Sequence, residues 1–222
     1  MPRRERRSVV AVDAVGPYAL VRLERGGLDP GTPGQFFMLE APGRVLPRPM
    51  SLCLAPPGEL AFLIDPIGPG TRALCSLADG DAIHVLGPLG NGFDLEVERP
   101  LLVGGGIGIA PLPYLSEALG QPRALLGFRT DAHAEAARLV PNADVVIEPT
   151  YVTELLPADP GDVLACGPEP MLAAVARLVP DAQLAWEAPM ACGYGACFGC
   201  VVEQGERFVR LCVEGPVLRA AA

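Results

Sequence analysis

The sequence has 222 residues, of which 50% are hydrophobic and 19% are charged, so it can build a large core and is not a disordered chain. Its formal net charge of -9 disfavours nucleic acid as a partner, because phosphate backbones repel an acidic protein. No apolar run reaches the roughly 18 residues that a membrane span needs. The cysteine count is seven, an odd number that suits ligands better than disulfides, so we expect a cytoplasmic protein.

Residues 1–98 are rich in short alternating or β-rich segments that are separated by Gly and Pro turns. We predict strands at 8–15, 19–24, 35–40, 50–54, 59–64 and 82–86, with one helix at 71–77. Six short strands with this punctuation are typical of a small antiparallel barrel.

Residues 99–187 change to an alternation of strands and helices. The predicted strands are 101–103, 123–128, 144–147, 162–166 and 183–187, and the predicted helices are 111–119, 132–140 and 169–179. This alternation indicates a doubly wound α/β domain with a parallel sheet. The remaining residues, 188–222, form a small lobe with one predicted hairpin, 200–203 and 207–212.

The lobe contains Cys192, Cys197, Cys200 and, after a longer gap, Cys212. The intervening glycines allow a loop to wrap around a central object and to aim backbone N–H groups inward. This spacing is that of plant-type [2Fe–2S] proteins, which would make the chain an electron-transfer protein. Four thiolates also suit a structural zinc ion, so that alternative stays open.

A glycine loop follows a predicted strand and opens a helix, which is the context of a dinucleotide phosphate site. The strict dinucleotide fingerprint is not met, because Ile109 occupies its last position. In the barrel, Arg48 can neutralise a phosphate, and Gly70 and Thr71 stand at a predicted helix start. Each of these motifs alone is common in ordinary turns.

The order of the motifs resembles the ferredoxin-NADP reductase superfamily and, within it, the electron-transfer subunits of class B, NAD-dependent dihydroorotate dehydrogenase. The likeness runs from about residue 8 to residue 217 and rests on segments 48–51, 68–71, 86–93, 104–108 and 166–168 and on the four cysteines. It implies an FAD-binding barrel at 1–98, an NAD-binding domain at 99–187 and a [2Fe–2S] lobe at 188–222.

The resemblance also implies a role for single residues. The FAD would contact Arg48, Pro49, Met50, Ser51, Leu63, Ile64, Asp65, Gly70 and Thr71. The NAD would contact Gly104, Gly105, Gly106, Gly108, Cys166, Gly167 and Pro168. The cluster ligands would be Cys192, Cys197, Cys200 and Cys212. Family members often carry a basic residue in place of Asp65. Asp131 would favour NAD and Arg129 would favour NADP, so the sequence leaves that preference open.

The implied function is an electron relay in pyrimidine (UMP) biosynthesis. A flavin-containing catalytic partner, joined in a 2+2 heterotetramer, would oxidise dihydroorotate, and electrons would reach NAD⁺ through the cluster and FAD. The two histidines, His84 and His133, are expected to be structural or solvent-facing, so we assign no catalytic residue. Two alternatives remain: a similar NAD(P)H reductase that serves a hydrogenase, a sulfide dehydrogenase or a ferredoxin, and a zinc-stabilised binding module without redox function.

Overall fold

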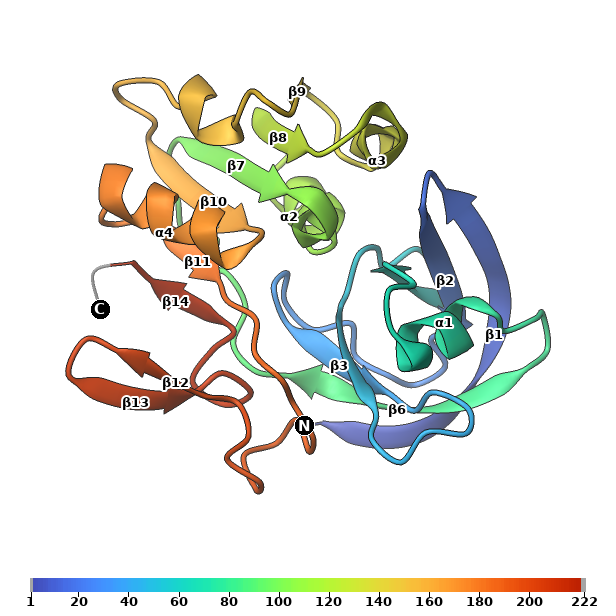
Figure 1. The fold of residues 1–222 in the computed structure, drawn as a ribbon. Helices are drawn as coiled ribbons and strands as arrows, with labels where there is room; N and C mark the ends of the chain where they lie inside the picture. The colour runs from blue at the N-terminus through green and yellow to red at the C-terminus, as the bar shows by residue number, and fades with distance from the viewer. Residues whose placement is uncertain (1, 221–222) are drawn as a thin grey trace.

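The computed structural model describes residues 2–220, which form a barrel, an α/β domain and a small C-terminal lobe (Figure 1). The barrel sheet has the order β4-β3-β6-β1-β2-β5, and all its strand pairs are antiparallel. Its strands are β1 (Arg3–Val15), β2 (Tyr18–Glu24), β3 (Phe36–Leu39), β4 (Arg48–Ser51), β5 (Glu59–Ile64) and β6 (Ala82–Leu89). The short helix α1 (Pro69–Cys75) packs Leu74 into the barrel core.

Strand β3 is continuously apolar, whereas most barrel strands would alternate apolar and polar residues. All four of its residues are buried, because the strand has a covered surface on both faces. Phe37 and Leu39 face the barrel interior, where Phe37 meets Phe62 edge to face at 5.6 Å between ring centroids. Phe36 and Met38 point the other way and pack against the C-terminal lobe.

The second sheet has the order β14-β11-β10-β7-β8-β9. Its strands are β7 (Pro100–Gly105), β8 (Ala124–Phe128), β9 (Ala143–Ile147), β10 (Asp162–Cys166), β11 (Gln183–Ala185) and β14 (Val217–Arg219). Five of them pair in parallel, and β14 adds an antiparallel edge next to β11.

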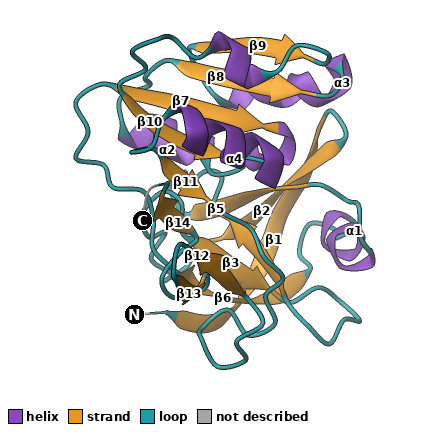
Figure 2. Cartoon of the chain, turned by 60° about the vertical axis from the view of Figure 1, so that its left-hand side comes forward, coloured by secondary structure: helices purple, strands orange, loops and turns teal. Residues whose placement is uncertain are grey.

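Helices cover both faces of this sheet (Figure 2). Leu102 faces a core shared with α2 (Leu112–Ala118) and the 3₁₀ helix η2 (Glu135–Leu139). Leu101 and Val103, its neighbours along β7, face the opposite core. That core includes residues of α4 (Glu169–Leu178) and of the 3₁₀ helix η3 (Val152–Leu155). This alternation confirms the doubly wound arrangement, since a strand between two helical layers buries both sets of side chains.

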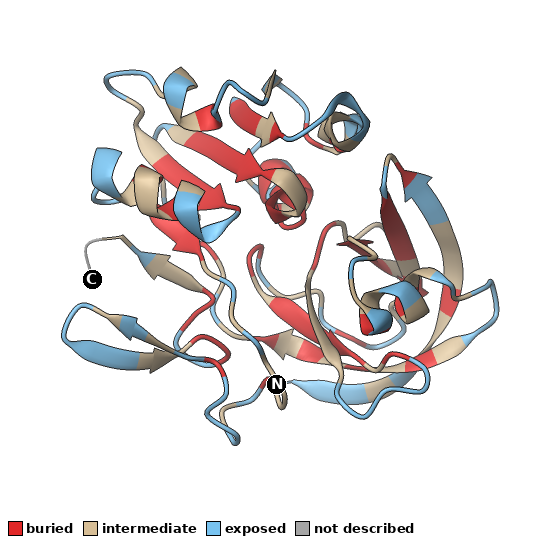
Figure 3. Cartoon of the chain, viewed as in Figure 1, coloured by how far each residue is buried: buried red, intermediate tan, exposed pale blue. Residues whose placement is uncertain are grey.

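The C-terminal lobe consists of loops and one hairpin, β12 (Val201–Gln204) and β13 (Arg207–Arg210). Figure 3 shows the buried residues concentrated in the strands of the two larger sheets, whereas the hairpin is mostly exposed. The lobe packs on the outer face of the barrel through Leu211, Cys200 and Cys212, which meet Phe36 and Met38.

Specific contacts fix the barrel against the α/β domain. The buried Gln183 exchanges two hydrogen bonds with the backbone of Asp94 in the connecting segment, at 2.7 and 2.9 Å. The Tyr114 hydroxyl donates to the carbonyl of Gly31 at 3.0 Å, and Arg138 donates to the carbonyl of Ala14 at 3.2 Å. These contacts hold the two sheets at a defined relative position.

The structure departs from the predicted elements at several places. Strand β1 begins at Arg3 rather than at residue 8, and β6 continues to Leu89 rather than ending at residue 86. The 3₁₀ helices η1 (Gly106–Ile109) and η3 were not predicted. The strand expected at 50–54 lies at Arg48–Ser51, and the strand expected at 183–187 ends at Ala185. The single helix expected at 132–140 is a short α3 (Asp131–Ala134) followed by the 3₁₀ helix η2. Strand β14 was not predicted, since three residues carry no readable period and its pairing with β11 is a tertiary event.

Candidate functional site

The four cysteines of the lobe are grouped in two pairs. The Cys192 and Cys197 side chains interact through a hydrogen bond, and so do those of Cys200 and Cys212. Among residues 2–220, no three His, Cys, Asp or Glu side chains surround a single point as one metal ion would require. Two pairs of thiols are the donor set that a two-iron cluster takes, because four thiolates are shared between two irons. The residues present therefore fit a [2Fe–2S] group.

Backbone N–H groups of the loop point at these sulfurs, as the glycine-rich spacing predicts. Burial opposes ionisation of Cys192, but hydrogen bonds from the N–H groups of Tyr194, Cys197 and Ala196 lower its pKa to about 6. The N–H of Gly195 is directed at Cys212, whose pKa burial and the neighbouring Cys200 raise to about 12. Inward N–H groups of this kind stabilise negative charge on sulfur.

A single residue, Met38, separates the cysteine loop from the predicted FAD segment. Gly193 packs on Met38 so closely that a Cβ there would lie 2.8 Å from the Met38 Sδ atom. In the barrel sheet, Met38 is the direct partner of Pro49 on β4. The cysteine loop and the segment Arg48–Ser51 therefore flank the same strand, β3.

The structure brings Arg48 to the first turn of α1, as a phosphate site requires. A Cβ on Gly70 would collide with the Arg48 guanidinium, so only glycine leaves room for this approach. Arg48 donates to the carbonyl of Leu46 at 2.9 Å, and within residues 2–220 it forms no ion pair. Thr71 accepts a hydrogen bond from the N–H of Gly68 at 3.0 Å. The uncompensated cation and the glycine beside it fit a diphosphate.

A cleft of about 660 Å³ lies between the barrel and the α/β domain, at the carboxyl ends of the parallel strands. This is where open α/β sheets bind nucleotides. Gly106 faces the cleft with φ of +53°. A Cβ at this position would meet no atom within 4 Å, so the backbone is open to a ligand. The volume and the bare glycine backbone fit a dinucleotide.

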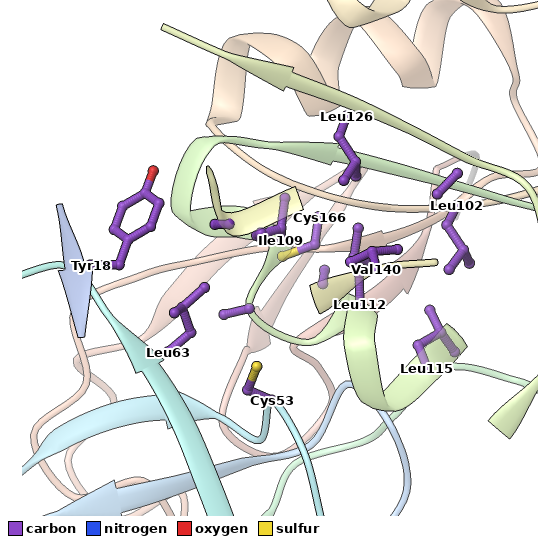
Figure 4. Packing of buried hydrophobic residues seen from close by; sticks show 14 of the residues in the cluster. Tyr18, Cys53, Leu63, Leu102, Ile109, Leu112, Leu115, Leu126, Val140 and Cys166 are labelled. Atoms are coloured by element: carbon purple, nitrogen blue, oxygen red, sulfur yellow. The ribbon is translucent and has the colours of Figure 1, made fainter. Parts of the chain in front are cut away.

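The predicted NAD residues divide into two groups. Gly105, Gly106 and Pro168 line the cleft. Gly104, Gly108, Cys166 and Gly167 are buried behind it, where Gly108 packs on the backbone of Gly167. Figure 4 shows the Cys166 thiol among core side chains that include Ile109, and burial raises its pKa. Its predicted place near the nicotinamide remains a prediction.

The predicted FAD residues lie along the barrel side of the same region. Arg48, Pro49, Met50 and Ser51 are half-buried on β4, and Leu63 and Ile64 are buried at the end of β5. Asp65, the next residue, lines the cleft together with Tyr18. The structure thus places Asp65 next to the predicted NAD site as well as at the end of a predicted FAD strand.

Sequence reasoning missed several residues that line the cleft. They are Tyr18, Ile107, Gly127, Phe128, Glu148, Thr150, Tyr151, Val152, Thr153, Pro170, Met171 and Ala174. The segment after β9 could have been found, because it follows the carboxyl end of a parallel strand. Tyr18 gave no such signal, since it reaches the cleft only through the packing of the barrel on the α/β domain. His133 also lines the cleft rather than facing bulk solvent, whereas His84 pairs with Glu40 at 3.2 Å.

Comparison with known proteins gives a consistent result. The iron–sulfur cluster binding domain of dihydroorotate dehydrogenase B matches residues 187–222. The electron transfer subunit of dihydroorotate dehydrogenase B (NAD(+)) from Clostridium perfringens is 34% identical over 205 residues, covering 83% of each chain. The corresponding subunit from Caldanaerobacter subterraneus subsp. tengcongensis is 35% identical over 211 residues, covering 85% of each chain.

A solved structure supports the fold. The NADH-dependent reduced ferredoxin-NADP oxidoreductase, studied for flavin-based electron bifurcation, superposes with a TM-score of 0.84. The match covers 96% of this chain and 88% of that chain at 23% sequence identity. It confirms the arrangement of barrel, α/β domain and C-terminal lobe.

Proposed function

The chain belongs to the family of electron transfer subunits of dihydroorotate dehydrogenase B, and from this premise we propose how its parts carry electrons to NAD⁺. The protein is an electron relay of pyrimidine biosynthesis that uses a [2Fe–2S] cluster, FAD and NAD. The electron path runs from the cysteine lobe, through the barrel, to the interdomain cleft. The observation that carries the proposal is the contact of Gly193 with Met38, the β-sheet partner of Pro49.

We assign the sites to the three parts of the fold. The lobe at 188–222 holds the cluster on Cys192, Cys197, Cys200 and Cys212. The barrel at 1–98 holds FAD, with Arg48 and the start of α1 at its diphosphate. The domain at 99–187 holds NAD, with its diphosphate at the open backbone of Gly106. When bound, the cluster supplies single electrons, and FAD converts them to the pair that NAD⁺ accepts.

The residues of this chain hold the cofactors in place and stabilise their charges. Loop N–H groups neutralise charge on the cysteine sulfurs, and Arg48 neutralises phosphate. The packing of Met38 on Gly193 keeps the lobe at a fixed place beside β4 and excludes water from the space between them. We assign no catalytic residue to this chain and place the chemistry of dihydroorotate on the catalytic partner.

The partner docks, in this proposal, over the exposed rim of the cysteine loop. Cys197 is exposed, and the neighbouring Tyr194 and Phe198 are each 62% exposed. A groove of about 440 Å³ lies beside Tyr194, where Cys192 and Tyr194 face Leu46 of the barrel. Large exposed apolar side chains around a redox centre suit a protein interface. We propose two copies of each subunit and a cytoplasmic location. Within residues 2–220, no helix is long and apolar enough to cross a membrane.

Two measurements test the proposal. The purified protein should show the absorption bands of a flavin and of a [2Fe–2S] cluster, with two irons per chain. Mixed with the catalytic subunit of dihydroorotate dehydrogenase B, it should support NAD⁺ reduction that depends on dihydroorotate. A colourless protein that contains zinc would refute the relay and favour a zinc-stabilised module. A coloured protein that passes no electrons from dihydroorotate would point to a reductase with another redox partner.

A further inference from the structure

The interdomain cleft receives almost all its lining from the α/β domain. Of the barrel residues that the structure describes, only Tyr18 and Asp65 reach it. The barrel therefore closes one side of a site whose other walls belong to the nucleotide-binding sheet. A residue in this position contacts a ligand only when both domains are in place.

Tyr18 is held rigidly at this position. It begins β2 and is 3% exposed. Its ring meets the His133 ring edge to face, with 5.5 Å between centroids and 66° between planes. The His133 Nδ1 atom lies 2.7 Å from the Thr130 Oγ1 atom, which fixes the imidazole at the start of α3. The edge-to-face contact of Tyr18 with His133 therefore joins the barrel to the α/β domain.

The Tyr18 hydroxyl has no hydrogen-bond partner within residues 2–220. The only side-chain polar atoms there that are both buried and unpartnered are Arg7 Nε and Ser116 Oγ, so solvent reaches the Tyr18 hydroxyl through the cleft. Figure 4 shows this hydroxyl pointing away from Leu63 and Cys53. Because the hydroxyl opens on the cleft and makes no hydrogen bond within residues 2–220, a ligand bound in the cleft can replace solvent as its partner.

Burial keeps this hydroxyl protonated at neutral pH. Burial raises the pKa of Tyr18 to about 12; the charge of Asp65 adds to the effect and that of Arg129 opposes it. At neutral pH the hydroxyl can therefore donate one hydrogen bond and accept another. Such a group suits the hydroxyls of a ribose or the oxygens of a phosphate.

The position of Arg129 shows which half of the nucleotide is involved. Arg129 follows β8 directly and lines the cleft. It stands about 20 residues after the glycine loop, which is the place where dinucleotide domains contact the adenosine ribose. Tyr18 lies at the same end, because its ring contacts His133, on the helix that follows Arg129.

We propose that the Tyr18 hydroxyl binds the adenosine half of NAD across the boundary between the barrel and the α/β domain. This inference rests on the proposed assignment of the cleft to NAD. Tyr18 is a nucleotide-binding residue in this role, and it does not contact the reacting end of the nucleotide. The barrel thereby contributes to nucleotide affinity as well as to flavin binding.

The test is Tyr18→Phe in the holoprotein, which removes the hydroxyl and keeps the ring that packs on His133. Isothermal titration calorimetry with ADP-ribose and with NAD⁺ should give Kd values about three- to tenfold higher than wild type, the loss of one hydrogen bond. Nicotinamide mononucleotide should bind unchanged. In steady-state assays the KM for NAD⁺ should rise while kcat stays the same.

Tyr114→Phe is the matched control for a loosening of the two domains, because its hydroxyl also joins them, by donating to the Gly31 carbonyl, but does not line the cleft. It should leave the ADP-ribose Kd unchanged. If the Tyr18→Phe variant bound ADP-ribose with wild-type affinity and kept its melting temperature, the role of Tyr18 would be wrong. The assignment of the cleft to NAD would still stand. A loss of FAD without a change in ADP-ribose affinity would likewise contradict the role of Tyr18. Failure of the wild-type protein to bind ADP-ribose would overturn the nucleotide assignment of the cleft itself.

Discussion

Gly108 sits where the two nucleotide loops of the α/β domain touch, and its replacement by alanine should separate them. A Cβ at this position would lie 2.6 Å from the Gly167 nitrogen and 2.7 Å from the Cys166 oxygen, whereas ordinary contact begins near 3.4 Å. The loops must therefore move apart by about 1 Å. Because the contacted atoms belong to backbone, no side chain can turn away to relieve the clash.

We expect Gly108→Ala to lower the free energy of unfolding by about 1–3 kcal/mol, the usual cost of overpacking. The displaced backbone at Gly106 should also slow NAD⁺ reduction by up to about 100-fold, since errors near 1 Å have effects of that size. Urea unfolding followed by circular dichroism measures the first effect. A steady-state assay of NAD⁺ reduction, with NAD⁺ titration calorimetry beside it, measures the second.

Gly27→Ala serves as the control for Gly108→Ala. A Cβ at Gly27 meets no atom within 4 Å. This substitution should change stability by less than about 0.5 kcal/mol and should leave NAD⁺ binding intact. If Gly108→Ala matched wild type in both stability and NAD⁺ affinity, the account of how the two loops form the nucleotide site would be wrong.

Three further substitutions test the other parts of the relay. Cys197→Ser should reduce the iron content, measured by plasma mass spectrometry, to background. The control Cys75→Ser should leave the iron content unchanged. Full iron content in the Cys197→Ser variant would contradict the ligand assignment. Arg48→Ala should raise the Kd for FAD about 10- to 100-fold in a fluorescence titration, because a charged hydrogen bond is lost. The control Arg123→Ala, which removes a surface ion pair at 2.7 Å, should leave the Kd for FAD unchanged. Equal FAD affinity in both variants would exclude Arg48 from the site. Met38→Ala should lower the free energy of unfolding by about 2–5 kcal/mol and loosen the lobe, so an unchanged denaturation midpoint would refute its role at that interface.

Local features of the sequence were sufficient for the larger part of the fold. Strand and helix periods, together with Gly and Pro turns, predict the two sheets because burial on one or two faces is reflected in the residue pattern. The cysteine spacing predicts the cluster site for a similar reason: all four sulfurs lie within one short stretch of chain. Strand β3 was predicted at 35–40, and its double burial follows only from the lobe that covers Phe36 and Met38.

Features that depend on distant parts of the chain were not predicted. Strand β14 exists because Val217–Arg219 finds the open edge of β11, which no local pattern indicates. Tyr18 became a cleft residue only when the tip of the β1–β2 hairpin was placed against His133. Both cases are tertiary contacts between segments separated by more than 30 residues. Single-residue roles at the FAD and NAD sites likewise came from the resemblance and not from periodicity.

The pairing of β11 with β14 has a consequence for how the iron–sulfur lobe is attached. Ala185 is the direct partner of Val217, and the Trp186 N–H donates to the Pro216 carbonyl at 2.9 Å. The whole lobe is therefore an elaborated hairpin loop, and not a domain strung on a linker. Both ends of the lobe are therefore fixed at one edge of the nucleotide sheet, which limits how far the cysteine loop can move relative to that sheet. The lobe carries all four cysteines, and its contacts with the barrel include the apolar patch around Met38 and the Asn91 side chain, which donates to the Glu214 carbonyl at 3.0 Å.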